Sequence, residues 1–181
     1  MCGRLDVWAA LGLLERDASA LYDSAVLIDS RGRIHMRYRR IQPQWHGKEA
    51  DPSVYRQGSE AESVATPFGT VSFLICGDLF DDAILARVRA LEPDLVLFPF
   101  ARCFSTDVDP QKQWEETEQQ EYTRRVRLLG AQTLMTNYLA GRDLNGGAFG
   151  GAFVVKGDGK VTHAWPLSRS GILFADIPAA G

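Results

Sequence analysis

The sequence contains few cysteines, no run of basic residues and no long apolar segment. Cys2, Cys76 and Cys103 follow no C-x-x-C spacing, which argues against a disulfide framework and a cysteine-based metal site. Twenty Lys and Arg against 23 Asp and Glu give a net charge of −3, so we expect no nucleic-acid partner. Neither a signal-peptide pattern nor about 18 uninterrupted apolar residues occurs. These absences predict a cytoplasmic protein with no membrane partner.

Glycines and histidines follow no cofactor pattern either. The glycines of residues 141–151 lack the G-x-G-x-x-G order of a dinucleotide site. None of His35, His46 and His163 has a neighbour at metal-ligand spacing. We therefore predict neither a dinucleotide site nor a histidine-based metal site.

The residues that are present predict one α/β domain over residues 1–181. Strands at 24–29 and 33–38 flank a turn in which Gly32 can adopt a positive φ. Residues 39–70 are polar, with scattered Pro and Gly, and predict a long loop. Within it we expect residues 42–66 to be the least ordered internal segment.

Strands and helices alternate in the second half of the chain. A strand ending at Cys76, a helix over 82–92 and a strand over 94–100 predict a right-handed crossover and a parallel sheet. A second helix, capped by Asp109 and covering 110–132, leads to a strand over 133–139. A hairpin then follows, over 150–156 and 160–165, and a last strand is predicted over 171–177.

The stretch VSFLICGDLFDD, residues 71–82, raises the question of chemistry because an apolar strand runs straight into Cys76. A free cysteine is often simply a small buried hydrophobe. A strand end followed by a tight turn is, however, also where α/β folds display a nucleophile. The local pattern leaves both interpretations open.

The ordered motifs LYDSAVLIDSRGRI, YRRI, FGTVSFLICGDLF, PDLVLFPFA, TNY, GGAFVV and GILFADI resemble the nitrilase, or carbon-nitrogen hydrolase, superfamily. The resemblance implies an α-β-β-α sandwich that is N-terminally incomplete in this chain and associates into a homo-oligomer. It also implies hydrolysis of a small-molecule amide, nitrile or N-carbamoyl substrate through a Cys thioester. That family uses a Glu base and a Lys, and no metal or organic cofactor.

The resemblance also assigns site residues. It implies that Cys76 is the nucleophile, that Arg40 stands in the lysine's place and that Glu49 lies near a supporting glutamate. An Arg is broader than a Lys and is never a proton donor at neutral pH, so this replacement changes the site. Four further positions are candidates for substrate binding: Gly77, which replaces an aromatic residue, Asp78, Phe80 and Tyr138.

The general-base Glu of the family lies upstream of the region that this chain resembles. Glu15 is the first acid available, and we expect it to be a surface residue after the strand that precedes the hairpin. Two functions follow: an amidase-type hydrolase with impaired turnover, or a catalytically silent fragment with a structural or subunit-interaction role. On the first, we expect Cys76 to alkylate faster than a shielded Cys103, with little multiple turnover.

Overall fold

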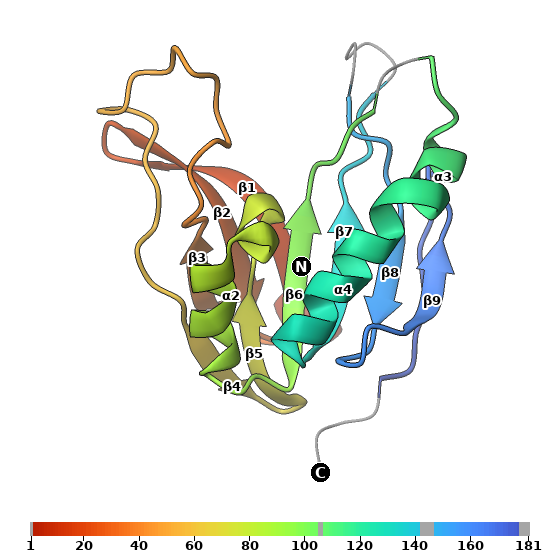
Figure 1. Cartoon of the computed structure of the whole chain (residues 1–181). Helices are drawn as coiled ribbons and strands as arrows, with labels where there is room; N and C mark the ends of the chain where they lie inside the picture. The colour runs from red at the N-terminus through yellow and green to blue at the C-terminus, as the bar shows by residue number, and fades with distance from the viewer. Residues whose placement is uncertain (1, 105–106, 142–146, 178–181) are drawn as a thin grey trace.

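The computed structural model describes residues 2–104, 107–141 and 147–177, and these form two sheets (Figure 1). The first sheet is antiparallel, in the order β1 (Ala9–Asp17), β2 (Ala20–Ile28), β3 (Ile34–Arg39). The second has six strands in the order β4 (Ser63–Thr66), β5 (Gly69–Phe73), β6 (Leu95–Phe100), β7 (Gln132–Asn137), β8 (Ala152–Val155), β9 (Val161–Trp165). Within it β5, β6 and β7 are parallel neighbours and the other pairs are antiparallel.

Helices cover one face of the six-stranded sheet, and β1–β3 lie against its other face (Figure 1). The helical segments are α1 (Cys2–Leu5), the 3₁₀ turn η1 (Cys76–Phe80), α2 (Asp82–Arg89), α3 (Pro110–Gln113), the π turn η2 (Trp114–Glu118) and α4 (Gln119–Leu129). Of these described helices only α2 and α4 exceed five residues, and both pack on the six-stranded sheet. The described part of the chain therefore has a helix layer and two sheet layers of the sandwich.

Two apolar clusters hold these layers together. The one between the sheets joins Ala25, Leu27 and Tyr38 of the first sheet to Val71 and Phe73 of β5. The one on the helix side contains Val88 of α2, Trp114 of η2, Val126 of α4 and buried side chains of β6–β8. Period-2 alternation in the strands sends successive side chains to these two opposite faces.

The first sheet covers only part of the second. Gly12 of β1 lies against Pro99 of β6, where an added Cβ would be 3.3 Å from the proline Cβ. Beyond β6, Thr136 and the middle of β9 are exposed. Leu11, Leu13 and Leu14 of β1 are exposed as well, at 53%, 39% and 64%. β1 thus carries apolar side chains in solvent, and parts of β7 and β9 are exposed as well.

The hairpin, both parallel crossovers and the 150–165 hairpin are confirmed. Gly32 has the expected positive φ of 82°, and the Asp109 carboxylate caps the helix that begins at Pro110. That helix is interrupted at residues 114–118 by the π turn. The chain shows no described helix that is long and apolar enough to span a membrane.

Three expectations were wrong. Residues 39–70 are not all loop, because 63–66 pair with β5 around a turn in which Gly69 has a φ of 112°. The strand before Cys76 ends at Phe73, three residues earlier than expected. Residues 171–177 form no strand, since β9 is the last strand of its sheet and the alternating Ile172 and Phe174 remain exposed. The degree of order in residues 42–66 stays a prediction.

Candidate active site

A cavity of about 740 Å³ lies between the two sheets at the carboxyl ends of β5, β6 and β7. This end of parallel strands is where open α/β sheets bind their ligands. The apolar part of its lining includes Phe73, Leu97 and Leu134, and its polar part includes Asp23, Arg40, Cys76 and Asn137. Residues from both sheets and from the loop after β3 therefore meet at one hollow.

Cys76 lines this cavity, and its backbone has a conformation that residues other than glycine seldom adopt. Its φ is +46°, in the left-handed region, and the chain turns there from the end of β5 into η1. The thiol is free and half-buried. A non-glycine residue in this region costs about 1–3 kcal/mol, and such residues cluster at active sites. Cys76 thus lies in a sharp turn between a strand and a helical turn, the kind of turn at which α/β folds can present a nucleophile.

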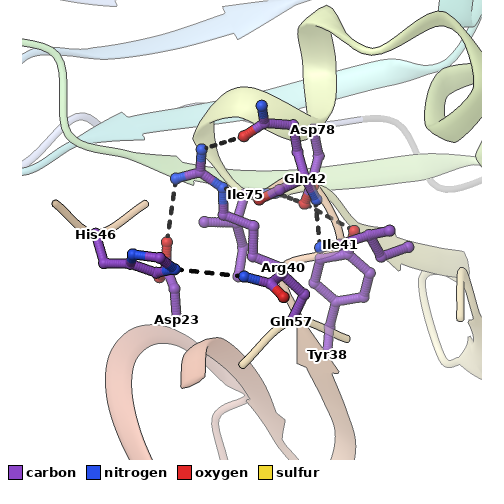
Figure 2. A network of polar contacts seen from close by, with 9 residues as sticks. All are labelled: Asp23, Tyr38, Arg40, Ile41, Gln42, His46, Gln57, Ile75 and Asp78. Carbon is purple, nitrogen blue, oxygen red and sulfur yellow. Dashed lines mark hydrogen bonds and ion pairs between the residues drawn. The ribbon is translucent and has the colours of Figure 1, made fainter. Parts of the chain in front are cut away.

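Asp78 fixes this turn from within. Its side chain is fully buried and accepts hydrogen bonds from Ile75 N at 3.0 Å, Ile41 N at 3.1 Å and Gln42 N at 2.7 Å. The Tyr38 hydroxyl donates a fourth, at 2.8 Å. Burial and the adjacent carboxylate raise the pKa of Tyr38, so this hydroxyl keeps its proton. Asp78 thereby ties the Cys76 turn to the end of β3 and the loop after it (Figure 2).

Arg40 lies against the same turn, with only 8% of its side chain exposed. Its Nε donates to Gln42 O at 3.1 Å, and its Nη2 donates to Gln42 Oε1 at 2.7 Å. A Cβ on Gly77 would overlap Arg40 Nη2, so the guanidinium occupies the space beside the backbone that follows Cys76. The glycine at 77 thus makes room for an arginine side chain at this point.

Asp23 is a further polar residue of the cavity lining, and it was not identified as a site residue from the sequence. Its Oδ2 accepts from Arg40 Nη1 at 3.4 Å (Figure 2). Burial raises the pKa of Asp23 above its usual range, and the charge of Arg40 opposes this shift. The available signal was the period-2 pattern of β2, in which Asp23 shares a face with the inward Ala25 and Leu27.

Asn137 also went unnoticed in the sequence. Its Oδ1 accepts from Arg102 N at 2.9 Å, and its Nδ2 donates to Gly150 O at 2.8 Å. These bonds join the loops after β6 and β7 at the rim of the cavity. Trp45 lines the cavity from the long loop and contacts the rings of His46 and Tyr55. Its Nε1 is buried without a hydrogen-bond partner in the described structure.

The other expected site residues divide into two groups. Tyr138 lines the cavity and Gly77 borders it. By contrast, Asp78 is enclosed in the turn, Phe80 packs edge-on against Tyr122 of α4 at 4.8 Å, and Glu49 is exposed outside the cavity lining. The structure therefore brings Cys76, Gly77, Arg40 and Tyr138 together, but not Glu49 or Phe80.

Two expectations about exposure were wrong. Glu15 is not a surface residue after the strand but part of β1, with 13% of its side chain exposed, and it accepts from Ser24 Oγ and the Arg39 guanidinium. It lines a separate hollow of about 290 Å³. Cys103 is exposed rather than shielded, because β6 ends at Phe100 and leaves the cysteine in the loop beyond.

No group of three or more His, Cys, Asp or Glu that could hold a metal ion occurs within residues 2–104, 107–141 and 147–177.

The model of the carbon-nitrogen hydrolase family matches residues 1–181. The chain belongs to this family. Its fold is accordingly a mixed α/β sandwich of the nitrilase type.

Several known members resemble the chain over nearly its whole length. The deaminated glutathione amidase of Dictyostelium discoideum is 25% identical over 186 residues, which cover 95% of this chain and 60% of that protein. A carbon-nitrogen hydrolase from Helicobacter pylori G27 matches with a TM-score of 0.81 and 19% identity, over 96% of this chain and 62% of the other.

A variant of the amidase from Nesterenkonia sp. AN1, solved after Michael addition of acrylamide at its active-site cysteine, matches with a TM-score of 0.78 and 18% identity, over 98% and 65% of the two chains. The chain thus spans about 60 to 65% of the length of these relatives.

Proposed function

We propose that this chain is an amidase-type hydrolase in which Cys76 forms a thioester with the acyl group of a small amide. The observation that carries the proposal is the left-handed turn at Cys76, which faces a cavity beside a buried guanidinium. Relatives named as amidases support it, and one of them was solved with acrylamide added to its active-site cysteine.

The chemistry requires a thiolate and stabilisation of a developing oxyanion. The sulfur of Cys76 attacks the amide carbonyl carbon, and the carbonyl electron pair moves to oxygen. Arg40 is always charged and lies beside the turn, so it stabilises this oxyanion together with backbone N–H groups of η1. The C–N bond then breaks, ammonia or an amine leaves with a proton, and water hydrolyses the thioester to a carboxylic acid and the free thiol.

The cavity indicates the substrate class. Its volume of about 740 Å³ falls within the usual range for small-molecule sites. Phe73, Leu97 and Leu134 offer an apolar surface for an acyl chain, while Arg40 and Asn137 lie at its polar side. Short aliphatic amides and N-carbamoyl compounds fit this division, and nitriles share the electrophilic carbon that the thiolate attacks.

The exposed apolar edge of β1 favours association and a second candidate function. Leu11, Leu13 and Leu14 are exposed on a strand that has only one neighbour in its sheet. Such an edge is a ready site for pairing with another chain. We propose a homo-oligomer on this basis. A cytoplasmic location is a separate proposal, supported by the three free cysteines. If hydrolysis does not occur, the same surface supports a structural or subunit-interaction role.

Ammonia release from a panel of short aliphatic amides and N-carbamoyl amino acids tests the proposal. A Cys103→Ser background removes the exposed thiol and serves as the parent for every variant. We expect release by the parent and none by the further variant Cys76→Ala. Equal release by both, or none by either, would contradict the hydrolase function.

A further inference from the structure

We propose that the site selects amides with a hydroxyl group on the carbon next to the carbonyl, and that Arg40 and Asp23 together recognise this hydroxyl. The preference rests on the proposed thioester chemistry and names its substrate class. Its basis is the set of hydrogen-bonding groups that the Arg40–Asp23 pair leaves unused at the cavity.

Arg40 keeps two N–H groups without an acceptor. A guanidinium has five N–H donors in a fixed plane. Its Nε and Nη2 donate to the backbone and side-chain oxygens of Gln42, at 3.1 and 2.7 Å, and its Nη1 lies 3.4 Å from Asp23 Oδ2. Within the described part of the chain these are the only hydrogen bonds of this side chain. One N–H on Nη1 and one on Nη2 therefore remain for a ligand.

The two unused N–H groups lie on one edge of the guanidinium. Gln42 and Asp23 are on different sides of it (Figure 2), and Gln42 occupies the edge formed by Nε and Nη2. The edge formed by Nη1 and Nη2 is the one left over. Two neighbouring N–H groups of this kind match a pair of acceptor oxygens that lie side by side.

This edge lies close to the backbone that follows the nucleophile. Arg40 and Cys76 line the same cavity, and a Cβ on Gly77 would overlap Arg40 Nη2. An amide bound with its carbonyl carbon at the Cys76 sulfur thus brings its carbonyl oxygen and the adjacent carbon toward the guanidinium. In a 2-hydroxy amide the two oxygens sit on neighbouring carbons, so both can accept from Arg40 at once. A hydroxyl one carbon further away forms a wider pair and fits less well.

Asp23 supplies the acceptor for the hydroxyl proton. A hydroxyl donates one hydrogen bond in addition to those it accepts. Asp23 lines the cavity with 28% of its side chain exposed, and within the described chain only its Oδ2 takes part in a side-chain hydrogen bond. Burial raises the pKa of Asp23, which shows that its charged form lacks solvation and gains from a further donor.

The pair favours a hydroxyl over the other groups that could stand there. A methyl group would leave N–H groups of Arg40 and an oxygen of Asp23 without partners and out of water. A carboxylate would suit Arg40 but would face the negative charge of Asp23. Only a group that both accepts and donates satisfies the two side chains together.

Glycolamide and propionamide test this preference, because a hydroxyl in the first replaces a methyl group in the second. 3-Hydroxypropionamide and butyramide form a second pair, with the hydroxyl one carbon further from the carbonyl. Ammonia release is measured for the Cys103→Ser parent and for Asp23→Ala, Asp23→Asn and Asp17→Ala made in it. Asp17 is the matched control, since it pairs with Arg39 Nη2 at 2.7 Å but is exposed and lies outside the cavity lining.

We expect kcat/KM of the parent to be about 10²- to 10⁴-fold higher for glycolamide than for propionamide, the value of two hydrogen bonds to charged groups. Asp23→Ala should lower this ratio at least tenfold. Asp23→Asn keeps one acceptor oxygen and should lower it less, and Asp17→Ala should leave it unchanged. The second pair of amides should show a much smaller ratio. Differences in the chemical reactivity of the amides cancel when the variants are compared.

Binding of the same amides to Cys76→Ala, followed by ligand-detected NMR, separates this preference from the proposed function. Equal kcat/KM for glycolamide and propionamide, or a ratio that both Asp23 variants leave unchanged, overturns the preference and leaves the thioester chemistry standing. Tighter binding of glycolamide with no hydrolysis by the parent overturns the proposed function alone. Equal binding of the two amides with no hydrolysis overturns both.

Discussion

Replacing Asp78 by alanine should destabilise the protein more than any other single change at the site. The carboxylate is the common acceptor of four donors, Ile41 N, Gln42 N, Ile75 N and Tyr38 Oη. An unsatisfied buried donor costs about 1–3 kcal/mol. At the low end of that range, four donors give a loss of about 4 kcal/mol in the free energy of unfolding.

Two matched variants refine this estimate. Asp78→Asn keeps the volume and one carbonyl oxygen, so it should lose roughly half as much, about 2 kcal/mol. Tyr38→Phe removes a single hydrogen bond to a charged group and should lose about 1.5 kcal/mol. A domain of this kind has about 5–15 kcal/mol of stability, so all three variants should remain foldable.

Urea unfolding followed by tryptophan fluorescence and far-UV circular dichroism measures these differences. With a slope of about 2 kcal/mol/M, a loss of 4 kcal/mol moves the midpoint by about 2 M. A loss below about 1 kcal/mol in Asp78→Ala, or a larger loss in Tyr38→Phe than in Asp78→Ala, would refute the role given to this carboxylate.

Three further predictions concern single side chains. Gly77→Ala should displace Arg40, because the added Cβ would overlap the guanidinium. We expect kcat/KM to fall at least tenfold with little change in the unfolding midpoint. Unchanged kinetics would show that Arg40 is dispensable. Glu15→Gln should destabilise the chain by about 1–3 kcal/mol at pH 7. Hydrogen bonding by Arg39 lowers the pKa of Glu15 to about 2 in the folded protein, against about 4.5 in the unfolded chain. The stability that Glu15 contributes is therefore present above pH 4.5 and is lost as the pH falls toward 2. A difference in unfolding free energy between the parent and Glu15→Gln that persisted in urea titrations at pH 2 would contradict this. Mass spectrometry should find Cys103 alkylated by iodoacetamide alongside Cys76, and a wholly protected Cys103 would show that its loop is covered in solution.

The sequence predicted those elements whose formation depends on residues close together in the chain. Alternation around Gly32 was enough for the β2–β3 hairpin, and the Asp109 cap was enough for the start of α3. The same reasoning failed at 171–177, because alternation shows which side chains share a face but not whether a neighbouring strand is there to pair with. β4 was missed for the opposite reason, since its four residues form a strand only through pairing with β5.

The same limit on prediction from the sequence applies to the residues of the candidate site. Cys76 could be found because the strand, turn and helix that present it are continuous in the sequence. The β2–β3 hairpin places Asp23 beside Arg40, whose backbone N donates to Asp23 O at 2.8 Å. The place of Asp23 in the cavity lining could not be found, because that depends on how the first sheet closes over the second. The expectation of little turnover rested on finding no acid to serve Cys76. That expectation stays a prediction, which the ammonia-release assay tests.

Trapping the acyl-enzyme tests the central claim, the thioester on Cys76, most directly. The Cys103→Ser chain is incubated with a short aliphatic amide, quenched in acid during turnover, digested and analysed by mass spectrometry. The account predicts an acyl adduct on the peptide that contains Cys76, absent from the Cys2 peptide and released by hydroxylamine. Hydrolysis of the amide without any adduct on Cys76, or an unmodified Cys76 with the amide intact, would contradict it.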